Sequence, residues 1–147
     1  MMRETNPSAV HLLNPRTCLQ TEEAPMGYVY DDQNIFAKIL RGEIPNTTVL
    51  ETEHSLAFRD LYPQAPVHVL VIPKGAYVCY DHFAQEASDA EILDYTRAIG
   101  KVCEMEGVAK DGFRMISNAG VAGVQEVPHL HVHILAGRPL GRMLQPA

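Results

Sequence analysis

The stretch from His129 to Ile134 constrains the fold of this chain more than any other, because histidine alternates strictly with an aliphatic residue for six positions. Side chains on a β-strand alternate between its two faces. A strand here places three imidazoles on one face and Leu130, Val132 and Ile134 on the other. The aliphatic face can pack into a core, so the histidine face is expected to look toward solvent or a ligand. Crowding imidazoles that titrate near neutral pH is costly, which disfavours a strand that carries them without a use.

Two chemistries are open to such a row. Alternate strand positions lie about 6.6 Å apart, and the outer histidines about 13 Å apart, whereas zinc takes each nitrogen at about 2 Å. All three therefore cannot bind one ion from a regular strand, but two can with a ligand from another strand, so a metal site remains an alternative. Phosphoryl chemistry suits an extended row better. One imidazole can attack phosphorus while a neighbour holds a phosphate oxygen or protonates the leaving group.

The histidine run belongs to a longer pattern. The segment Gln-Glu-Val-Pro-His-Leu-His-Val-His-Ile resembles the signature of the histidine triad (HIT) family of nucleotide hydrolases and transferases, and other segments resemble the Hint branch of that family in the same order along the chain. The resemblance covers residues 31–144. Its motifs are residues 34–39 with 41–45, 60–68 with 71–74, 125–134 and 137–140.

The resemblance implies an α+β, HIT-like fold: a five-stranded antiparallel sheet with two helices, whose homodimer forms a ten-stranded sheet. It implies action at the α-phosphate of nucleoside phosphoramidates or aminoacyl-adenylates, through a nucleotidyl-histidine intermediate. The substrate is then a purine nucleotide, and no metal or other cofactor is required, because imidazole can serve as both nucleophile and acid.

The same resemblance implies roles for four histidines. His131 is the nucleophile, and its other ring nitrogen must donate a hydrogen bond, for which a backbone carbonyl near His129 is the expected acceptor. His133 contacts phosphate oxygens and helps to protonate the departing amine. His129, with His68 behind it, shapes and polarises the row.

Nucleotide-binding residues also follow from the resemblance. Asp60 accepts from ribose hydroxyls, Asn118 touches phosphate or ribose, and apolar side chains sandwich the base. Gln125 and Glu126 line the phosphate and leaving-group side. The implied set is Ile35, Phe36, Ile39, Phe58, Asp60, Leu61, Asn118, Gln125, Glu126 and Val127.

Three residues depart from the pattern of many relatives. Pro128 stands where an aromatic residue is common, and proline cannot donate to a strand ladder, so pairing at the start of this strand is expected to differ. Val124 replaces a glycine and adds bulk beside the phosphate loop. Glu126 replaces a serine, and its carboxylate indicates a preference for leaving groups that carry a positive charge.

The length predicts one domain. Residues 1–30 are expected to form an irregular N-terminal extension, and the resemblance implies that 31–147 form the HIT domain; Met26 is a candidate alternative start. No apolar run approaches the roughly 18 residues of a membrane span. The net charge of −6 argues against general nucleic-acid binding, which relies on a basic surface. Cys18, Cys79 and Cys103 form no Cys-x-x-Cys pair, which fits a reducing cytoplasmic location.

Local signals predict the order of elements. A short helix follows the cap Asn34, a long helix starts at a capping box of Ser88 and Glu91, and Gly107 stops it. Strands are expected over residues 47–51, 56–60, 67–72 and 113–118. Helices are expected on one side of the sheet, and the aromatic residues between 77 and 83 in a loop. His11, His54 and His82 are expected at the surface.

Three functions compete with phosphoramidate hydrolysis. Dinucleoside polyphosphate hydrolysis, as in the Fhit branch, is disfavoured by the tail Gly137-Arg138-Pro139-Leu140. A nucleotide-binding module that acts through protein partners, with weak activity, is the second. Metal binding is the third.

Overall fold

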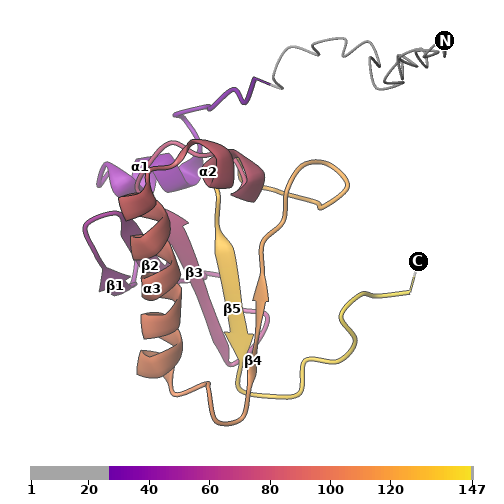
Figure 1. Cartoon of the computed structure of the whole chain (residues 1–147). Helices are drawn as coiled ribbons and strands as arrows, with labels where there is room; N and C mark the ends of the chain where they lie inside the picture. The colour runs from indigo at the N-terminus through magenta and orange to yellow at the C-terminus, as the bar shows by residue number, and fades with distance from the viewer. Residues whose placement is uncertain (1–26, 147) are drawn as a thin grey trace, which may run out of the picture.

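The computed structural model describes residues 27–146, so the alternative start at Met26, His11 and Cys18 lie outside the described residues. Figure 1 shows helices packed on a twisted sheet. The described helices are α1 (Ile35–Leu40), α2 (Tyr80–Glu86) and α3 (Asp89–Glu106). The strands are β1 (Thr48–Glu51), β2 (Ser55–Arg59), β3 (Val67–Pro73), β4 (Phe113–Ile116) and β5 (Val132–Ala136).

The strands form one antiparallel sheet in the order β1-β2-β3-β5-β4, which confirms the five-stranded α+β fold. β3 lies at the centre, as its continuous apolar run predicts. The sheet places β5 directly beside β3, although α2, α3 and β4 separate them along the chain (Figure 1). This pairing brings His68 on β3 into the neighbourhood of the histidine run.

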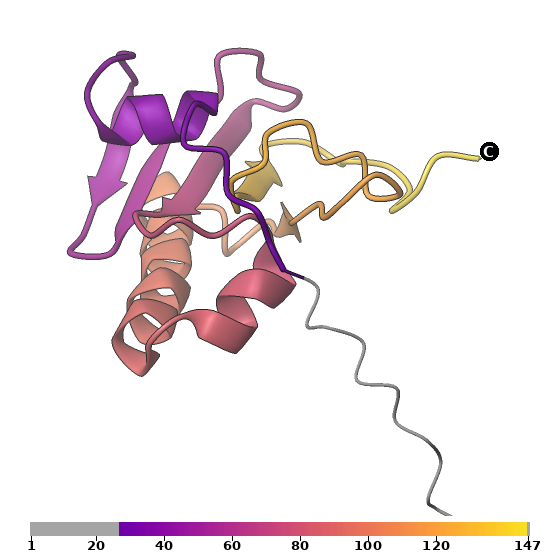
Figure 2. The same cartoon turned by 90° about the horizontal axis from the view of Figure 1, so that it is seen from above.

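Both faces of the sheet are covered, which corrects the expectation that the helices lie on one side. Val69 and Val71 of β3 belong to a core that includes residues of α2 and α3. Leu70 and Ile72 point the other way and pack with Phe36 of α1. Figure 2 shows α1 and α3 on opposite sides of the strands. A strand that is apolar at nearly every position requires cover on both faces, and α1 provides the second layer.

The predicted helix ends are confirmed. The Asn34 side-chain oxygen accepts from the Ala37 N–H at 2.9 Å and begins α1. Ser88 and Glu91 form the capping box of α3, and Gly107 ends that helix with a left-handed φ of 64°. Tyr95 then docks α3 on the sheet, since its hydroxyl donates to the Val71 carbonyl at 2.8 Å.

Helix α2 occupies the region that was expected to be a loop. It has seven residues, and its N-cap Cys79 makes no side-chain capping bond, so the sequence carries no start signal for it. Phe83 from α2 enters the core. His82 is buried rather than at the surface: its Nδ1 accepts from the Val78 N–H at 3.0 Å, and its Nε2 lies 2.8 Å from a Glu86 carboxylate oxygen. Within residues 27–146, no helix combines the length and apolar character needed to cross a bilayer.

Candidate active site

A cavity of about 420 Å³ opens on the α1 side of the sheet. Its walls come from α1, from the end of β2 with the residues after it, from the loop before the histidine run, and from the run itself. Of the residues that the sequence singled out, those that line it are Ile35, Phe36, Ile39, Phe58, Asp60, Leu61, Asn118, Glu126, Val127, His131 and His133. Eleven of the fourteen predicted site residues, drawn from segments far apart in the sequence, thus meet at one cavity.

The first three residues of the histidine run are not paired with β3. The ladder with β3 begins only at Val132, and the residues before it are held by other bonds. The His129 N–H donates to the Val127 carbonyl at 2.9 Å, and the Leu130 N–H donates to the Tyr77 carbonyl at 2.7 Å. Pro128 has no N–H to donate, and it precedes the first ladder pair at Val132.

The alternation of the run nevertheless holds. Leu130, Val132 and Ile134 are buried in the core that α3 covers, and His131 and His133 line the cavity on the opposite face. His129 differs from the expectation, because it is fully buried and looks at neither solvent nor the cavity. Its Nε2 instead lies 2.8 Å from the Pro73 carbonyl.

The tautomer of His131 follows from its hydrogen bond. Its Nδ1 lies 2.7 Å from the carbonyl oxygen of His129, and a carbonyl can only accept, so Nδ1 carries the proton. Burial lowers the pKa of His131, although the His129 carbonyl and the carboxylates of Asp60 and Glu126 oppose the shift. A neutral imidazole protonated on Nδ1 keeps a lone pair on Nε2. The predicted carbonyl acceptor at residue 129 is thereby confirmed.

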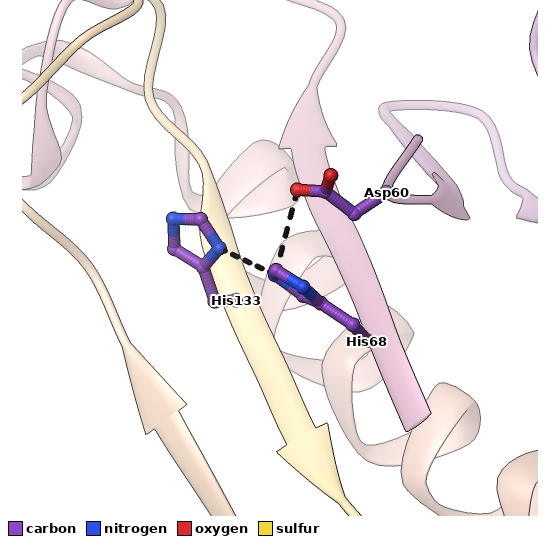
Figure 3. Close-up of side chains that lie close together, drawn as sticks. All are labelled: Asp60, His68 and His133. Carbon is purple, nitrogen blue, oxygen red and sulfur yellow. Dashed lines mark hydrogen bonds and ion pairs between the residues drawn. The ribbon is translucent and has the colours of Figure 1, made fainter. Parts of the chain in front are cut away.

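His133 has the opposite tautomer, which is set by His68 (Figure 3). The Gln64 N–H donates to Nδ1 of His68 at 3.1 Å, so in neutral His68 the proton is on Nε2. That Nε2–H lies 2.9 Å from Nδ1 of His133 and donates to it. The proton of neutral His133 is therefore on Nε2. Burial lowers the pKa of His133 to about 4, helped by the neighbouring His131 and His68, so the ring is neutral near pH 7.

His68 thus supports His133, which corrects the expectation that it stands behind His129. The physical reason is strand register: His68 pairs with Leu135 across the ladder, and His133 with Leu70, so His68 and His133 are diagonal neighbours on one face. His68 is buried, and its Nε2 also lies 3.5 Å from a carboxylate oxygen of Asp60. Burial lowers the pKa of His68, while Asp60 acts against the shift.

Within residues 27–146, one set of side chains could hold a metal ion, which was the alternative to phosphoryl chemistry. Asp60, His68 and His133 offer ligand atoms that all lie within 4.8 Å of one another, and His129 and His131 do not belong to this set. Two zinc ligands at about 2 Å in tetrahedral geometry are roughly 3.3 Å apart, whereas the two facing nitrogens are 2.9 Å apart and share a proton. A metal ion here would have to displace that proton and separate the rings.

Of the two polar residues predicted in the loop before the histidine run, Glu126 lines the cavity and Gln125 does not. Gln125 does not line the cavity, because its side-chain amide donates to the carbonyls of Val78 and Val127 at 2.6 and 2.9 Å and braces the loop. Glu126 lines the cavity and is exposed, and its side chain makes no hydrogen bond or ion pair within residues 27–146. Val124 also lines the cavity with a φ of 56°, a conformation that β-branched residues rarely adopt.

Several lining residues were missed by sequence reasoning. Gln64 and Tyr62 lie inside a segment that carried the family resemblance, so that segment was the available signal. Ile44 and Pro45 also lie inside such a segment, whereas nothing in the local pattern marks Asn46. Val124 was expected beside the phosphate loop; the lining residues that were missed are Ile44, Pro45, Asn46, Arg59, Tyr62, Gln64 and Leu70.

Comparisons with known proteins agree on one family. The family model described as "HIT domain" matches residues 41–140. An uncharacterised HIT-like protein of Azospirillum brasilense is 57% identical over 119 residues, which cover 81% of this chain and 98% of that one. The purine nucleoside phosphoramidase of Escherichia coli K12 is 44% identical over 113 residues, or 77% of this chain and 94% of the enzyme. The solved structure of a HIT family hydrolase from Clostridium thermocellum matches with a TM-score of 0.68 and 38% identity, over 78% of this chain and 99% of that one.

The residues that match the family model include β2, β3, the loop before the histidine run and the run itself. The chain therefore belongs to the HIT family.

Proposed function

We propose that this protein hydrolyses nucleoside phosphoramidates and related aminoacyl-adenylates at the α-phosphate, through a nucleotidyl-histidine intermediate. The observation that carries the proposal is the pair of opposite tautomers at one cavity. His131 has a bare Nε2, His133 has a protonated Nε2, and their ring centroids are 5.0 Å apart. Nucleophilic displacement needs a lone pair that attacks phosphorus, and it is aided by an N–H that donates a hydrogen bond to the departing nitrogen or to a phosphate oxygen.

The first step uses both histidines. The Nε2 lone pair of His131 forms a bond to the α-phosphorus as the bond from phosphorus to the leaving amine breaks. His133 donates its Nε2–H as a hydrogen bond to the departing nitrogen and stays neutral, and the leaving amine takes its proton from water. His68 holds the tautomer of His133 that directs this N–H toward the leaving group. The Nδ1–H bond to the His129 carbonyl stabilises the positive charge that His131 acquires.

The second step releases the nucleotide. Water attacks the phosphorus of the nucleotidyl-histidine and releases a proton to solvent, which balances the proton that the amine took in the first step. The bond between phosphorus and His131 breaks, a nucleoside monophosphate leaves, and His131 returns to its neutral form with the proton on Nδ1.

The cavity supports a nucleotide as the substrate. Its volume of about 420 Å³ lies within the range of small-molecule sites. The rings of Phe36 and Phe58 meet edge to face with centroids 5.6 Å apart, which offers an apolar wall for a purine. Asp60 also lines the cavity, and its carboxylate can accept from ribose hydroxyls. The relative named purine nucleoside phosphoramidase supports the same substrate class.

The deciding experiment compares adenosine phosphoramidate with diadenosine polyphosphates on one sample, with and without a chelator. Turnover of the phosphoramidate, unchanged by chelator, is the expected result. Loss of activity with chelator and its recovery with zinc would indicate a metal-dependent reaction at Asp60, His68 and His133. Faster turnover of the dinucleoside polyphosphate would favour that competing function. Tight nucleotide binding without turnover of the phosphoramidate or the dinucleoside polyphosphates would favour a nucleotide-binding module that acts through protein partners.

Glu126 is expected to favour substrates whose leaving amine is positively charged. Its carboxylate lines the cavity near His131 and is exposed. An exposed charge pair is worth roughly 0.2–1 kcal/mol after screening, so Glu126→Ser should lower kcat/KM for a lysyl-adenylate about 1.4- to fivefold more than for adenosine phosphoramidate. The difference should shrink as salt rises.

The matched control is Glu104→Ser, which removes an exposed carboxylate on α3 that pairs with Lys101. It should leave the ratio of the two kcat/KM values unchanged. Equal losses on both substrates with Glu126→Ser, independent of salt, would show that Glu126 does not select the leaving group.

The protein is also proposed to be a homodimer. β4 is an edge strand of the sheet, and its Phe113 and Met115 side chains are 45% and 55% exposed. Unpaired strand edges with apolar side chains favour association. Sedimentation at micromolar concentration should give twice the chain mass of 16.3 kDa, and Met115→Lys should shift it toward monomer. A wild-type monomer under the same conditions would count against the proposal.

A further inference from the structure

The segment before α1 has no helix or strand, yet it is attached to the domain at two points. We call residues 27–33 the N-terminal strap. Tyr28 stacks on the His82 ring at a centroid distance of 4.4 Å, and its hydroxyl donates to Asp81, so this end of the strap lies against α2. Tyr30 reaches the histidine row: its hydroxyl lies 2.5 Å from Nδ1 of His129.

The far end of the strap is joined to α1. The side-chain amide of Asn34 donates to the Asp31 carbonyl at 2.7 Å, and Arg41 donates to the Asp32 carbonyl at 2.7 Å. Tyr30 is therefore placed between two anchored ends. Its ring meets that of His129 edge to face, with centroids 5.6 Å apart.

The direction of the bond between Tyr30 and His129 follows from the other nitrogen of the ring. His129 Nε2 lies 2.8 Å from the Pro73 carbonyl, which can only accept, so Nε2 carries the proton and Nδ1 is an acceptor. Burial lowers the pKa of His129 to about 4 and raises the pKa of Tyr30. Near neutral pH a neutral phenol therefore donates to a neutral imidazole.

This bond matters because the carbonyl of His129 holds the nucleophile. His131 Nδ1–H donates to that carbonyl, and residue 129 lies ahead of the first ladder pair at Val132. Its position depends on its own N–H bond to Val127 and on the two bonds of its ring. If the His129 ring loses one of its two hydrogen bonds, the backbone carbonyl of His129 is held less firmly. That carbonyl is the group that fixes the tautomer of His131.

We propose that Tyr30 is a positioning residue for the nucleophile: through His129 it holds His131 in the tautomer that leaves Nε2 free. The inference rests on the proposed function for its kinetic consequence, but its structural part can be measured without substrate. It also makes the N-terminal strap part of the working domain, beyond what the histidine signature contains.

The kinetic test compares Tyr30→Phe with Tyr28→Phe. Phenylalanine keeps the ring and its edge contact with His129 and removes only the hydroxyl. Loss of one hydrogen bond corresponds to about a three- to tenfold fall in kcat, with KM for adenosine phosphoramidate within about twofold of wild type. The acid limb of the kcat/KM profile should also move to lower pH, because a weaker bond to the His129 carbonyl no longer raises the pKa of His131 as much. Tyr28→Phe alters the same strap away from the histidine row and should keep wild-type kinetics.

The second readout is nitrogen NMR of ¹⁵N-histidine-labelled protein without substrate. In the wild type, His129 should be protonated on Nε2 with an acceptor-type Nδ1, and His131 protonated on Nδ1. In Tyr30→Phe the signals of both rings should move toward tautomer averaging, with no such change in Tyr28→Phe. If the wild type fails to turn over the phosphoramidate while these shifts occur, the proposed function fails and the positioning role stands.

Two outcomes would overturn the inference. One is a wild-type His129 that already averages its tautomers, a measurement that does not depend on any variant folding. The other is a Tyr30→Phe protein whose His131 NMR signals and pH profile are both unchanged, even if kcat falls. A smaller folded fraction would lower the apparent kcat without changing the signals or the profile, so a fall in kcat alone does not support the inference.

Discussion

His131→Ala should abolish turnover of adenosine phosphoramidate while nucleotide binding largely persists. Within residues 27–146, its Nε2 is the only imidazole lone pair at the cavity when His131 and His133 have the tautomers described above. Without it no covalent intermediate can form, and removal of a nucleophile costs at least about a thousandfold in kcat. The apolar wall of Phe36 and Phe58 and the carboxylate of Asp60 remain, so binding should change little.

Two measurements separate chemistry from binding. Calorimetric titration of the variant with adenosine monophosphate should give a Kd within about fivefold of wild type, because Phe36, Phe58 and Asp60 are unchanged. Mass spectrometry of wild-type reactions quenched in alkaline denaturant, which preserves the acid-labile phosphorus–nitrogen bond, should detect the nucleotidyl adduct on His131, which the variant lacks. His54→Ala, in the turn between β1 and β2, serves as a control for loss of an imidazole. A variant with near-normal kcat, or an adduct on another residue, would refute the assignment.

The second large effect is acid sensitivity. The pKa of His129 falls from about 6.5 to about 4 on folding because the ring is buried. Between these values the unfolded chain binds a proton that the folded protein excludes, so stability is full above about pH 6.5 and is lost as pH falls toward 4. A shift of this size corresponds to about 3 kcal/mol. His133 shifts in the same direction and adds to the loss, although the two rings are coupled through His131.

Urea unfolding at a series of pH values between 7.5 and 5 measures this effect apart from the carboxylates. Asp94 and Glu91 have lowered pKa values, so their contribution is lost at lower pH. His129 contributes about 2 kcal/mol of this loss between pH 6.5 and 5, and His129→Gln, whose amide can still donate to the Pro73 carbonyl, should remove most of that contribution. His54→Gln should retain it. A wild-type free energy of unfolding that is constant from pH 7.5 to 5 would contradict buried neutral imidazoles.

Much of the fold could be predicted from local pattern. The alternation of the histidine run places Leu130 and Val132 in the core and His131 at the cavity, as the structure confirms. The capping box at Ser88 and the glycine at position 107 mark both ends of α3. These features depend on neighbours within a few residues, so the sequence alone determines them. The helix α2 carries no capping signal and is held by Phe83 in the core, which is why it was missed.

The assembly of the candidate site depended on tertiary structure. The sequence identified the histidines and most of the cavity lining, but not which histidine supports which. The register between β3 and β5 puts His68 beside His133 rather than His129. That contact places the proton of His133 on Nε2, whereas His131 carries its proton on Nδ1. Tyr30 reaches His129 across 99 positions of sequence. Strand alternation fixes the face of a side chain, but proton positions depend on hydrogen-bond partners distant in sequence, which only the packed fold brings together.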